Sequence, residues 1–220
     1  MSVMTSKAAK NRIFIVDDHP IVRKGIANML GRDFVVCGEA ESVEEALPAI
    51  GRIKPDLVIV DLSLKGAGGL ELLKDLQIRH PNIPTLVMSM HDETLFAERV
   101  LRAGARGYVM KAEAVNELDR AVRRVLSGNV YLSPAMSDRV LNAFSTGDKD
   151  PDASPMKRLS DRELEVFEMI GRGLPMREIA KALHLSVKTV ETHRAHIKEK
   201  LDIPTALQLV HHATQWVSGR

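Results

Sequence analysis

The sequence predicts a doubly wound α/β domain with a five-stranded parallel sheet, followed by a small all-α domain. Three observations support this prediction. Between residues 11 and 128, short apolar runs alternate five times with helical patterns, which is typical of a parallel sheet with helices on both faces. A polar stretch with Gly and two Pro then marks a linker at 145–156. Residues 156–220 contain four further helical patterns.

The composition is that of an ordinary globular protein, with 45% hydrophobic and 27% charged residues, and 220 residues allow two domains. Cys37 is the only cysteine, so no disulfide can form within the chain, which fits a reducing compartment. The N-terminal stretch lacks the apolar core of a signal peptide, and no apolar stretch approaches the ~20 residues needed to cross a bilayer. We therefore expect a cytoplasmic protein with no membrane partner.

Five apolar runs, several of them rich in β-branched residues, predict the strands, at 12–16, 34–37, 57–60, 84–88 and 107–110. Apolar residues at helical spacing predict a helix after each strand. The first follows His19 and Pro20, with its apolar stripe at Val22, Ile26, Met29 and Leu30, and the others span 43–52, 70–78, 93–103 and 115–126. In the last of these helices the expected inward stripe starts at Val115.

Polar or ionisable side chains stand where four of the five strands end. Asp17 and Asp18 follow the first strand, Asp61 follows the third, Ser89 follows the fourth and Lys111 follows the fifth. Each alone is compatible with an ordinary turn residue or helix cap. Ligands of doubly wound sheets bind beyond the carboxyl ends of the strands, so the five residues together indicate a site at one edge of the sheet.

The residue types at this edge suggest its chemistry. Clustered carboxylates repel one another unless a cation joins them, and oxygen ligands select a hard ion such as Mg²⁺. Asp61 can then stay ionised and act as a nucleophile toward phosphorus. Lys111 can neutralise phosphoryl oxygens, and the Ser89 hydroxyl can hydrogen-bond one of them.

The C-terminal part begins after a possible short helix at 134–144. Ser160 and Glu163 form a capping box ahead of the first of four helices. The second helix is expected at 176–183, and Ser186 caps a third helix that ends near Leu201. A tight turn joins the two, so together they form a helix-turn-helix. Such a unit places its second helix in the major groove of DNA. On composition alone an ordinary solvated helix face remains open, because Glu191 and Glu199 oppose phosphate binding.

The chain resembles a known family in both halves. Asp17, Asp18, Asp61, Ser89 and Lys111 on five β-α units resemble the receiver domain of two-component response regulators, which has a flavodoxin-like fold. The run LSDRELEVFEMIGRGLPMREIAKALHLSVKTVETHRAHIKEKL resembles the LuxR-type helix-turn-helix. Together they resemble the NarL/FixJ subfamily, which implies a receiver at 11–128, a linker with a short helix at 129–155 and a DNA-binding domain at 156–220.

The resemblance also implies roles for residues of the receiver. Asp61 would accept a phosphoryl group from a sensor histidine kinase. Asp18, Asp61 and the carbonyl of Ser63 would hold Mg²⁺ directly, with Asp17 helping through water. Lys111 would assist this step, and Ser89 and Tyr108 would act as switch residues, with Tyr108 turning inward on phosphorylation. Lys65 and Ala112 depart from the family, which usually has proline at these two positions.

In the DNA-binding domain the resemblance implies binding of double-stranded promoter DNA. The expected contacts are Ser186, Lys188, Thr189, Arg194 and Lys200 for the phosphates and capping region, and Glu191, Thr192 and Ala195 for the bases. The last helix carries Leu209, Val210, Ala213 and Trp216 on one face, which in this family pairs two domains into a homodimer. The alternative, that this face only closes the core of its own domain, remains open.

The expected function is that of a phosphorylation-controlled transcription factor, not an enzyme beyond assisting its own phosphorylation and dephosphorylation. One alternative is a constitutive DNA-binding regulator that needs no phosphorylation. An aspartyl phosphatase is disfavoured, because Ser63 stands where the general acid would be needed.

Overall fold

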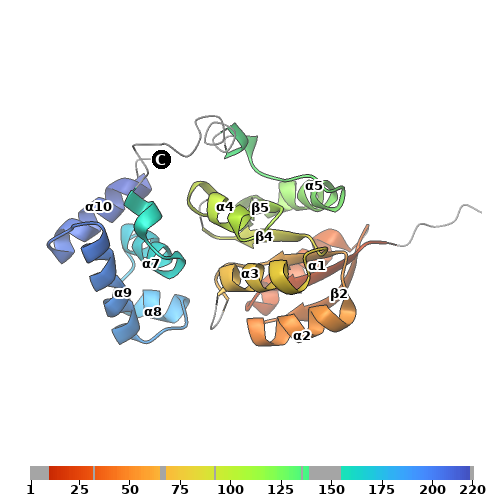
Figure 1. The fold of residues 1–220 in the computed structure, drawn as a ribbon, viewed down its shortest axis with the longest axis horizontal. Helices are drawn as coiled ribbons and strands as arrows, with labels where there is room; N and C mark the ends of the chain where they lie inside the picture. Colours follow the sequence, from red (N-terminus) through yellow and green to blue (C-terminus); the bar gives the residue numbers. More distant parts are fainter. Residues whose placement is uncertain are drawn as a thin grey trace, which may run out of the picture. The chain divides into compact units, whose positions relative to one another are not determined.

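The computed structural model describes residues 10–31, 33–64, 68–91, 93–134, 136–138 and 155–218. They divide into two compact units at residue 140 (Figure 1). No helix among these residues has both the length and the apolar character needed to pass through a membrane.

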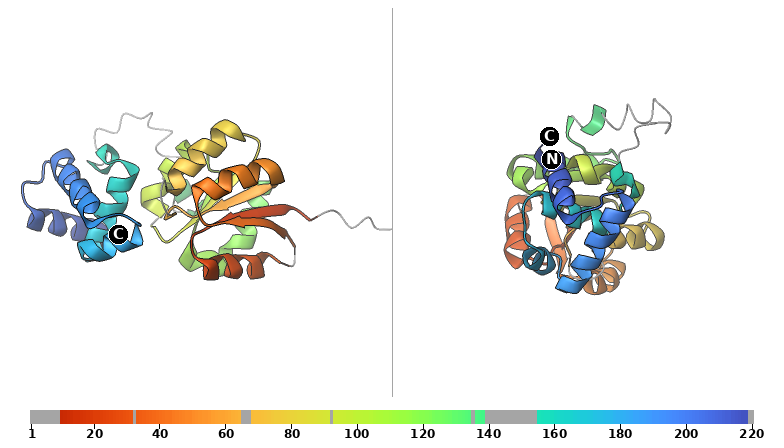
Figure 2. Two further views of the ribbon diagram at one scale, coloured as in Figure 1. Left: turned by 90° about the horizontal axis from the view of Figure 1, so that it is seen from below. Right: turned by 90° about the vertical axis from the view of Figure 1, so that its left-hand side faces the viewer.

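The N-terminal unit is a five-stranded, all-parallel sheet with the strand order β2-β1-β3-β4-β5. The strands are β1 (Arg12–Val16), β2 (Val35–Ala40), β3 (Leu57–Val60), β4 (Thr85–Ser89) and β5 (Gly107–Met110). The helices are α1 (Pro20–Leu30), α2 (Val43–Ile53), α3 (Gly69–Arg79), α4 (Glu93–Arg102) and α5 (Ala114–Leu126). Figure 2 shows α1 and α5 on one face of the sheet and α2 and α3 on the other. The predicted fold class is confirmed.

The central strands are buried along their whole length because both of their faces are covered. All four residues of β3 are buried, and so are all five of β4. One core cluster joins residues of β1, β3 and β4 to α1 and α5, for example Ile15, Ile59, Leu86, Leu118 and Val122.

One expected core residue lies outside the core. Val115 is 82% exposed, whereas Ala114, Leu118, Ala121, Val122 and Val125 are buried. A short 3-10 helix, Lys111–Glu113, stands between β5 and α5 and sets the rotation with which α5 meets the sheet. The buried stripe therefore begins at Ala114.

The chain turns back at Gly128, whose φ of +87° lies in the left-handed region that favours glycine. Tyr131 then pairs with Gly107 of β5 in parallel orientation. Pro134 and residues 136–138 are helical, and the rest of the short helix predicted at 134–144 lies outside the described residues, as does most of the predicted linker.

The C-terminal unit contains α7 (Asp161–Gly171), α8 (Met176–Ala182), α9 (Val187–Lys200) and α10 (Ala206–Ser218), after a short 3-10 helix, Pro155–Arg158. The predicted capping box of Ser160 and Glu163 is present at the start of α7. Phe167 of α7 meets Trp216 of α10 edge-on, with ring centroids 5.3 Å apart. Helix α10 approaches closely at Gly171, where a Cβ atom would lie 2.4 Å from the carbonyl oxygen of Ala213.

Candidate functional site

The strand ends bring their polar side chains together at the carboxyl edge of the sheet. The Lys111 ammonium nitrogen Nζ lies 2.7 Å from Oδ2 of Asp61 and 2.7 Å from Oδ2 of Asp17. Carboxylate oxygens of Asp17, Asp18 and Asp61 and a ring nitrogen of His19 all lie within 4.8 Å of one another. The three aspartates are buried, with exposed fractions of 1%, 6% and 2%.

Strand register explains why these residues meet. Val16 pairs with Val60 across the β1–β3 ladder, and the Asp61 main-chain N–H donates to the Val16 carbonyl at 2.9 Å. Asp17 and Asp61 therefore leave the sheet side by side. Helix α3 begins directly against this backbone, because a Cβ atom on Gly69 would lie 2.0 Å from the Asp61 carbonyl oxygen.

Burial and charge act in opposite directions on the acid and the amine. Burial raises the pKa of Asp61, and the nearby Lys111 ammonium only partly offsets this. For Lys111, burial alone lowers the pKa, but the Asp61 and Asp17 carboxylates outweigh burial and leave its pKa raised. Lys111 is therefore charged at neutral pH and compensates the two acids.

The two oxygens of the Asp61 carboxylate differ. Lys111 bonds Oδ2, whereas Oδ1 is buried and is not bonded by Lys111. Such an atom is costly in a folded protein unless a cation or another ligand meets it. The carboxylates of Asp17, Asp18 and Asp61 together form a donor set that suits a hard divalent cation such as Mg²⁺.

His19 belongs to this group, although the sequence analysis gave it no role. Its Nδ1 lies 2.6 Å from Oδ1 of Asp18 and 3.4 Å from Oδ1 of Asp17. Its main-chain N–H donates to Oδ1 of Asp17 at 2.8 Å. In the sequence, the position of His19 directly after the two aspartates was the feature that could have indicated this role.

The two expected switch residues are linked through a second histidine. The Ser89 hydroxyl accepts a hydrogen bond from the His91 main-chain N–H at 3.2 Å, and the Tyr108 hydroxyl donates to the His91 carbonyl at 2.8 Å. Both side chains are buried, so Tyr108 already has the inward position that was expected to follow phosphorylation. The His91 ring lies 3.0 Å from the Ser63 hydroxyl, measured from Nε2 to Oγ. Sequence reasoning missed His91, two residues after Ser89.

The structure describes only one of the two positions at which the chain lacks the proline usual in the family. Lys65 lies outside the described residues. The peptide bond between Lys111 and Ala112 is trans.

The candidate DNA-binding face lies on α9. Ser186 caps this helix, since its hydroxyl accepts from the Thr189 N–H at 3.0 Å. Most of the expected contact residues are exposed, namely Ser186, Lys188, Glu191, Thr192, Ala195 and Lys200, whereas Thr189 and Arg194 are partly buried. Val187 in the first turn of α9 is 39% exposed, whereas Val190 and Ile197 of the same helix are buried.

Lys200 has a partner within its own domain. Its Nζ lies 2.6 Å from Oε2 of Glu163, the same atom that accepts from the Ser160 N–H at 2.7 Å in the capping box. Burial alone would raise the pKa of Glu163, but the bonds from Lys200 and Ser160 outweigh burial and lower it. Lys200 therefore joins the end of α9 to the start of α7.

The expected dimer face of α10 is mostly turned into its own domain. Leu209 and Ala213 have an exposed fraction of 0%, and Trp216 is partly buried against Phe167. Of the four predicted residues only Val210 is exposed, at 44%, and the neighbouring Leu207 is 80% exposed. The close approach of α10 to α7 at Gly171 accounts for this difference.

Comparison with known proteins agrees with both units. Residues 13–123 match the family model described as response regulator receiver domain, and residues 157–213 match the model described as bacterial regulatory proteins, luxR family. The chain is 37% identical to "Response regulator GacA" of Pseudomonas viridiflava over 200 residues, 90% of this chain and 92% of that protein. It is 36% identical to "Oxygen regulatory protein NreC" of Staphylococcus carnosus over 208 residues, 92% of this chain and 96% of that protein.

Solved structures give the same picture. The crystal structure of a LuxR-family two-component response regulator from Aurantimonas sp. SI85-9A1 has a TM-score of 0.58 at 33% identity, covering 62% of this chain and 99% of that one. RcsB from Salmonella enterica serovar Typhimurium, bound to promoter P1flhDC in the presence of the phosphomimetic BeF3-, has a TM-score of 0.62 at 26% identity, covering 94% of this chain and 100% of that one. The chain belongs to the response regulators of the NarL/FixJ family, with a receiver domain followed by a LuxR-type DNA-binding domain, and is a transcriptional regulator.

Proposed function

We propose that Asp61 accepts a phosphoryl group from the phosphohistidine of a sensor histidine kinase, and that this modification changes promoter binding by the C-terminal domain. The observation that supports this most directly is the pairing of Lys111 with the two buried carboxylates of Asp61 and Asp17, which leaves Oδ1 of Asp61 buried and not bonded by Lys111. We expect the regulator to act in the cytoplasm, with the receiver at 11–128, the linker at 129–155 and the DNA-binding domain at 156–220.

In the proposed reaction a carboxylate oxygen of Asp61 forms a bond to phosphorus. The bond between phosphorus and the imidazole nitrogen breaks, and that nitrogen keeps the electron pair. Lys111 offsets the charge of the phosphoryl oxygens, and the Ser89 hydroxyl donates to one of them. These groups also serve the later hydrolysis, so the receiver assists its own phosphorylation and dephosphorylation.

Asp17, Asp18, Asp61 and the main-chain carbonyl of Ser63 would hold Mg²⁺, which when bound offsets negative charge on the carboxylates and the phosphoryl group. The buried Oδ1 of Asp61, which Lys111 does not bond, and the three-carboxylate donor set support this assignment.

We assign DNA contacts to α9, with Lys188, Arg194 and the capping residues Ser186 and Thr189 at the phosphates and with Glu191, Thr192 and Ala195 at base edges. RcsB, the similar protein, is described both bound to promoter DNA and as two dimers bound to two parallel DNAs. By this similarity we expect a homodimer on DNA, with Val210 and Leu207 on the exposed side of α10 as contact residues.

The test compares Asp61→Asn with Asp33→Asn, which alters an acid whose side chain is 57% exposed in a surface ion pair. Each variant is incubated with Mg²⁺ and a labelled phosphoramidate. We expect Asp33→Asn to take up label that hydroxylamine releases and Asp61→Asn to take up none. Continued labelling of Asp61→Asn would place the acceptor elsewhere. Full labelling of the wild type without any change in promoter affinity would favour a constitutive regulator.

A further inference from the structure

The first residues of the proposed linker, directly after α5, are hydrogen-bonded to the sheet of the receiver. We call residues 129–134 and 136–138 the post-α5 segment. β5 is an edge strand, and an edge strand has main-chain groups that need partners. The Tyr131 N–H donates to the Arg106 carbonyl at 2.9 Å, and the Tyr108 N–H donates to the Tyr131 carbonyl at 2.9 Å. The segment is therefore bonded directly to the residue that carries the expected aromatic switch.

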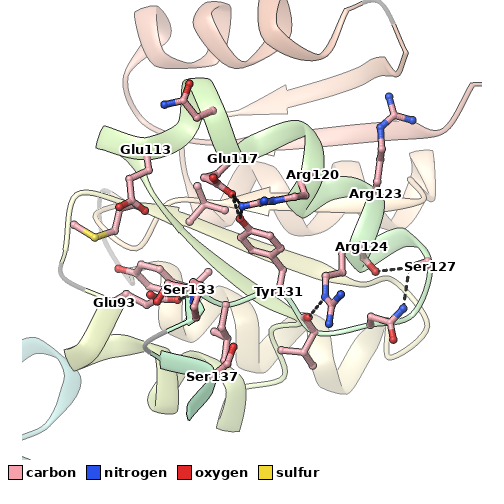
Figure 3. Close-up of a pocket in the computed structure, with 18 residues that line it drawn as sticks. Glu93, Glu113, Glu117, Arg120, Arg123, Arg124, Ser127, Tyr131, Ser133 and Ser137 are labelled. Carbon is pink, nitrogen blue, oxygen red and sulfur yellow. Dashed lines mark hydrogen bonds and ion pairs between the residues drawn. The ribbon is translucent and has the colours of Figure 1, made fainter. Parts of the chain in front are cut away.

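The side chain of Tyr131 fixes this first half of the segment. Its hydroxyl bonds Glu117, and the Arg120 guanidinium lies 6.0 Å from its ring centre. These residues line a cavity of about 820 Å³ between α5 and the segment (Figure 3). Gly107 permits the close approach, since a Cβ atom there would lie 2.9 Å from the Tyr131 carbonyl oxygen.

The second half is held differently, by the start of α4. The Ser133 N–H donates to Oε1 of Glu93 at 2.9 Å. The Ser133 hydroxyl accepts from the Met136 N–H at 3.2 Å, and the Ser133 carbonyl accepts from the Ser137 N–H at 2.9 Å. Ser133 thus starts the short helical turn that follows, and the carboxylate of Glu93 fixes its position.

Glu93 lies only four residues after Ser89. The main chain between them includes His91, which bonds both the Ser89 hydroxyl and the Tyr108 hydroxyl. The post-α5 segment is therefore connected to Ser89 twice, through His91, Tyr108 and Tyr131, and through Glu93 and Ser133. The chain reaches the C-terminal domain only through this segment.

We propose that the post-α5 segment couples phosphorylation to the DNA-binding domain by releasing Ser133 from Glu93 while Tyr131 stays on β5, a role that rests on the proposed phosphorylation of Asp61. When Ser89 bonds a phosphoryl oxygen, His91 follows through its bond to the Ser89 hydroxyl. Glu93 at the start of α4 is then displaced, and its carboxylate no longer meets the Ser133 N–H. Tyr131 stays in place because two main-chain bonds and a buried ring hold it, whereas one bond to a side chain holds the Ser133 N–H.

The experiment is amide hydrogen exchange on the full-length protein, with and without beryllofluoride and Mg²⁺. We expect the Ser133, Met136 and Ser137 amides to exchange roughly tenfold faster when beryllofluoride is added, while the Tyr108 and Tyr131 amides keep their protection. Glu93→Ala should speed exchange at Ser133 without beryllofluoride and abolish most of the further response. Glu93→Gln keeps a side-chain oxygen acceptor and should behave as the wild type.

The outcomes separate the two proposals. If beryllofluoride leaves the amides around Ser89 and Lys111 unchanged, the proposed function fails. If those amides respond but the Ser133, Met136 and Ser137 amides do not, the coupling role is overturned and the proposed function stands. The same conclusion holds if the Tyr131 amide also loses its protection. If Glu93→Gln exchanges as fast as Glu93→Ala at Ser133, the hydrogen bond to Glu93 is not what holds the segment.

Discussion

The carboxyl edge of the receiver sheet and the exposed face of α9 use charged residues in opposite ways. At the sheet edge the charges are buried, and Lys111 lies within 2.7 Å of two carboxylates. On α9 most of the polar residues are exposed, and the Thr192 hydroxyl donates to the Lys188 carbonyl of the same helix. The function of a buried charged residue therefore depends on its neighbours in the same chain, whereas the function of an exposed charged residue depends on the molecule that binds it.

The largest expected effect tests the buried side of this contrast. Replacing Lys111 with Ala leaves two buried carboxylates without their cation, which costs about 3 kcal/mol or more of unfolding free energy at pH 7. The pKa of Asp61, raised by burial, should rise further in this variant because the ammonium that lowers it is gone. Urea unfolding measures the loss.

The pH dependence of Lys111→Ala follows from the sign of that shift. A carboxyl whose pKa is higher in the folded than in the unfolded chain binds its proton more tightly when folded. The variant should therefore regain stability as the pH falls through the folded-state pKa of Asp61. Adding Asp61→Asn should restore stability at pH 7; a double variant no more stable than Lys111→Ala would contradict the assignment.

The next effect concerns backbone packing at the same edge. In Gly69→Ala the new Cβ would lie 2.0 Å from the Asp61 carbonyl oxygen, so α3 must shift, at a cost of about 2–3 kcal/mol. Gly25→Ala is the matched control. Among the described residues, no atom beyond its chain neighbours and the backbone of its own helix lies within 4 Å of the new Cβ, and the helix gains about 0.5–1 kcal/mol. Thermal unfolding of both variants distinguishes them. Equal behaviour of the two would show that the backbone at Asp61 is not confined by α3.

On the exposed side, Lys188 and Lys200 are predicted to differ although both are lysines of α9. Lys188→Ala should weaken DNA binding at all sequences and reduce the slope of log K against log salt by about 0.9, with stability unchanged. Lys200→Ala should cost about 1 kcal/mol of stability through its bond to Glu163 and leave the slope nearly unchanged. If Lys200→Ala lowers the slope as much as Lys188→Ala, Lys200 contacts phosphate as the family resemblance implied.

The smallest effect concerns His193, whose pKa is lowered mainly by burial. A histidine with a lower pKa in the folded chain binds a proton more weakly there, so the folded state loses stability as the pH falls below the unfolded-state pKa of about 6.5. His193→Gln should therefore lose less stability than the wild type between pH 7 and pH 5 in urea unfolding. If the stability of the two proteins changes equally with pH, the pKa of His193 is not lowered in the folded chain.

Much of the receiver site could be predicted because it depends on local patterns. Strand runs ending in Asp17, Asp61, Ser89 and Lys111 lead to one edge in any parallel sheet, so their convergence needed no knowledge of individual contacts. His19 and His91 were missed because a histidine near a strand end has many ordinary roles, and only its ring position assigns one.

The amino-acid sequence by itself determined the order of the elements, the acids and amine at the strand ends, and the helix-turn-helix, because these follow from short-range periodicity and capping. The tertiary structure decided that Tyr131 extends the sheet at β5, that Lys200 bonds Glu163, that Tyr108 lies inward, and that Leu209 and Ala213 face their own core. Each of these depends on which of several distant elements packs against a side chain, and local spacing carries no information about that choice.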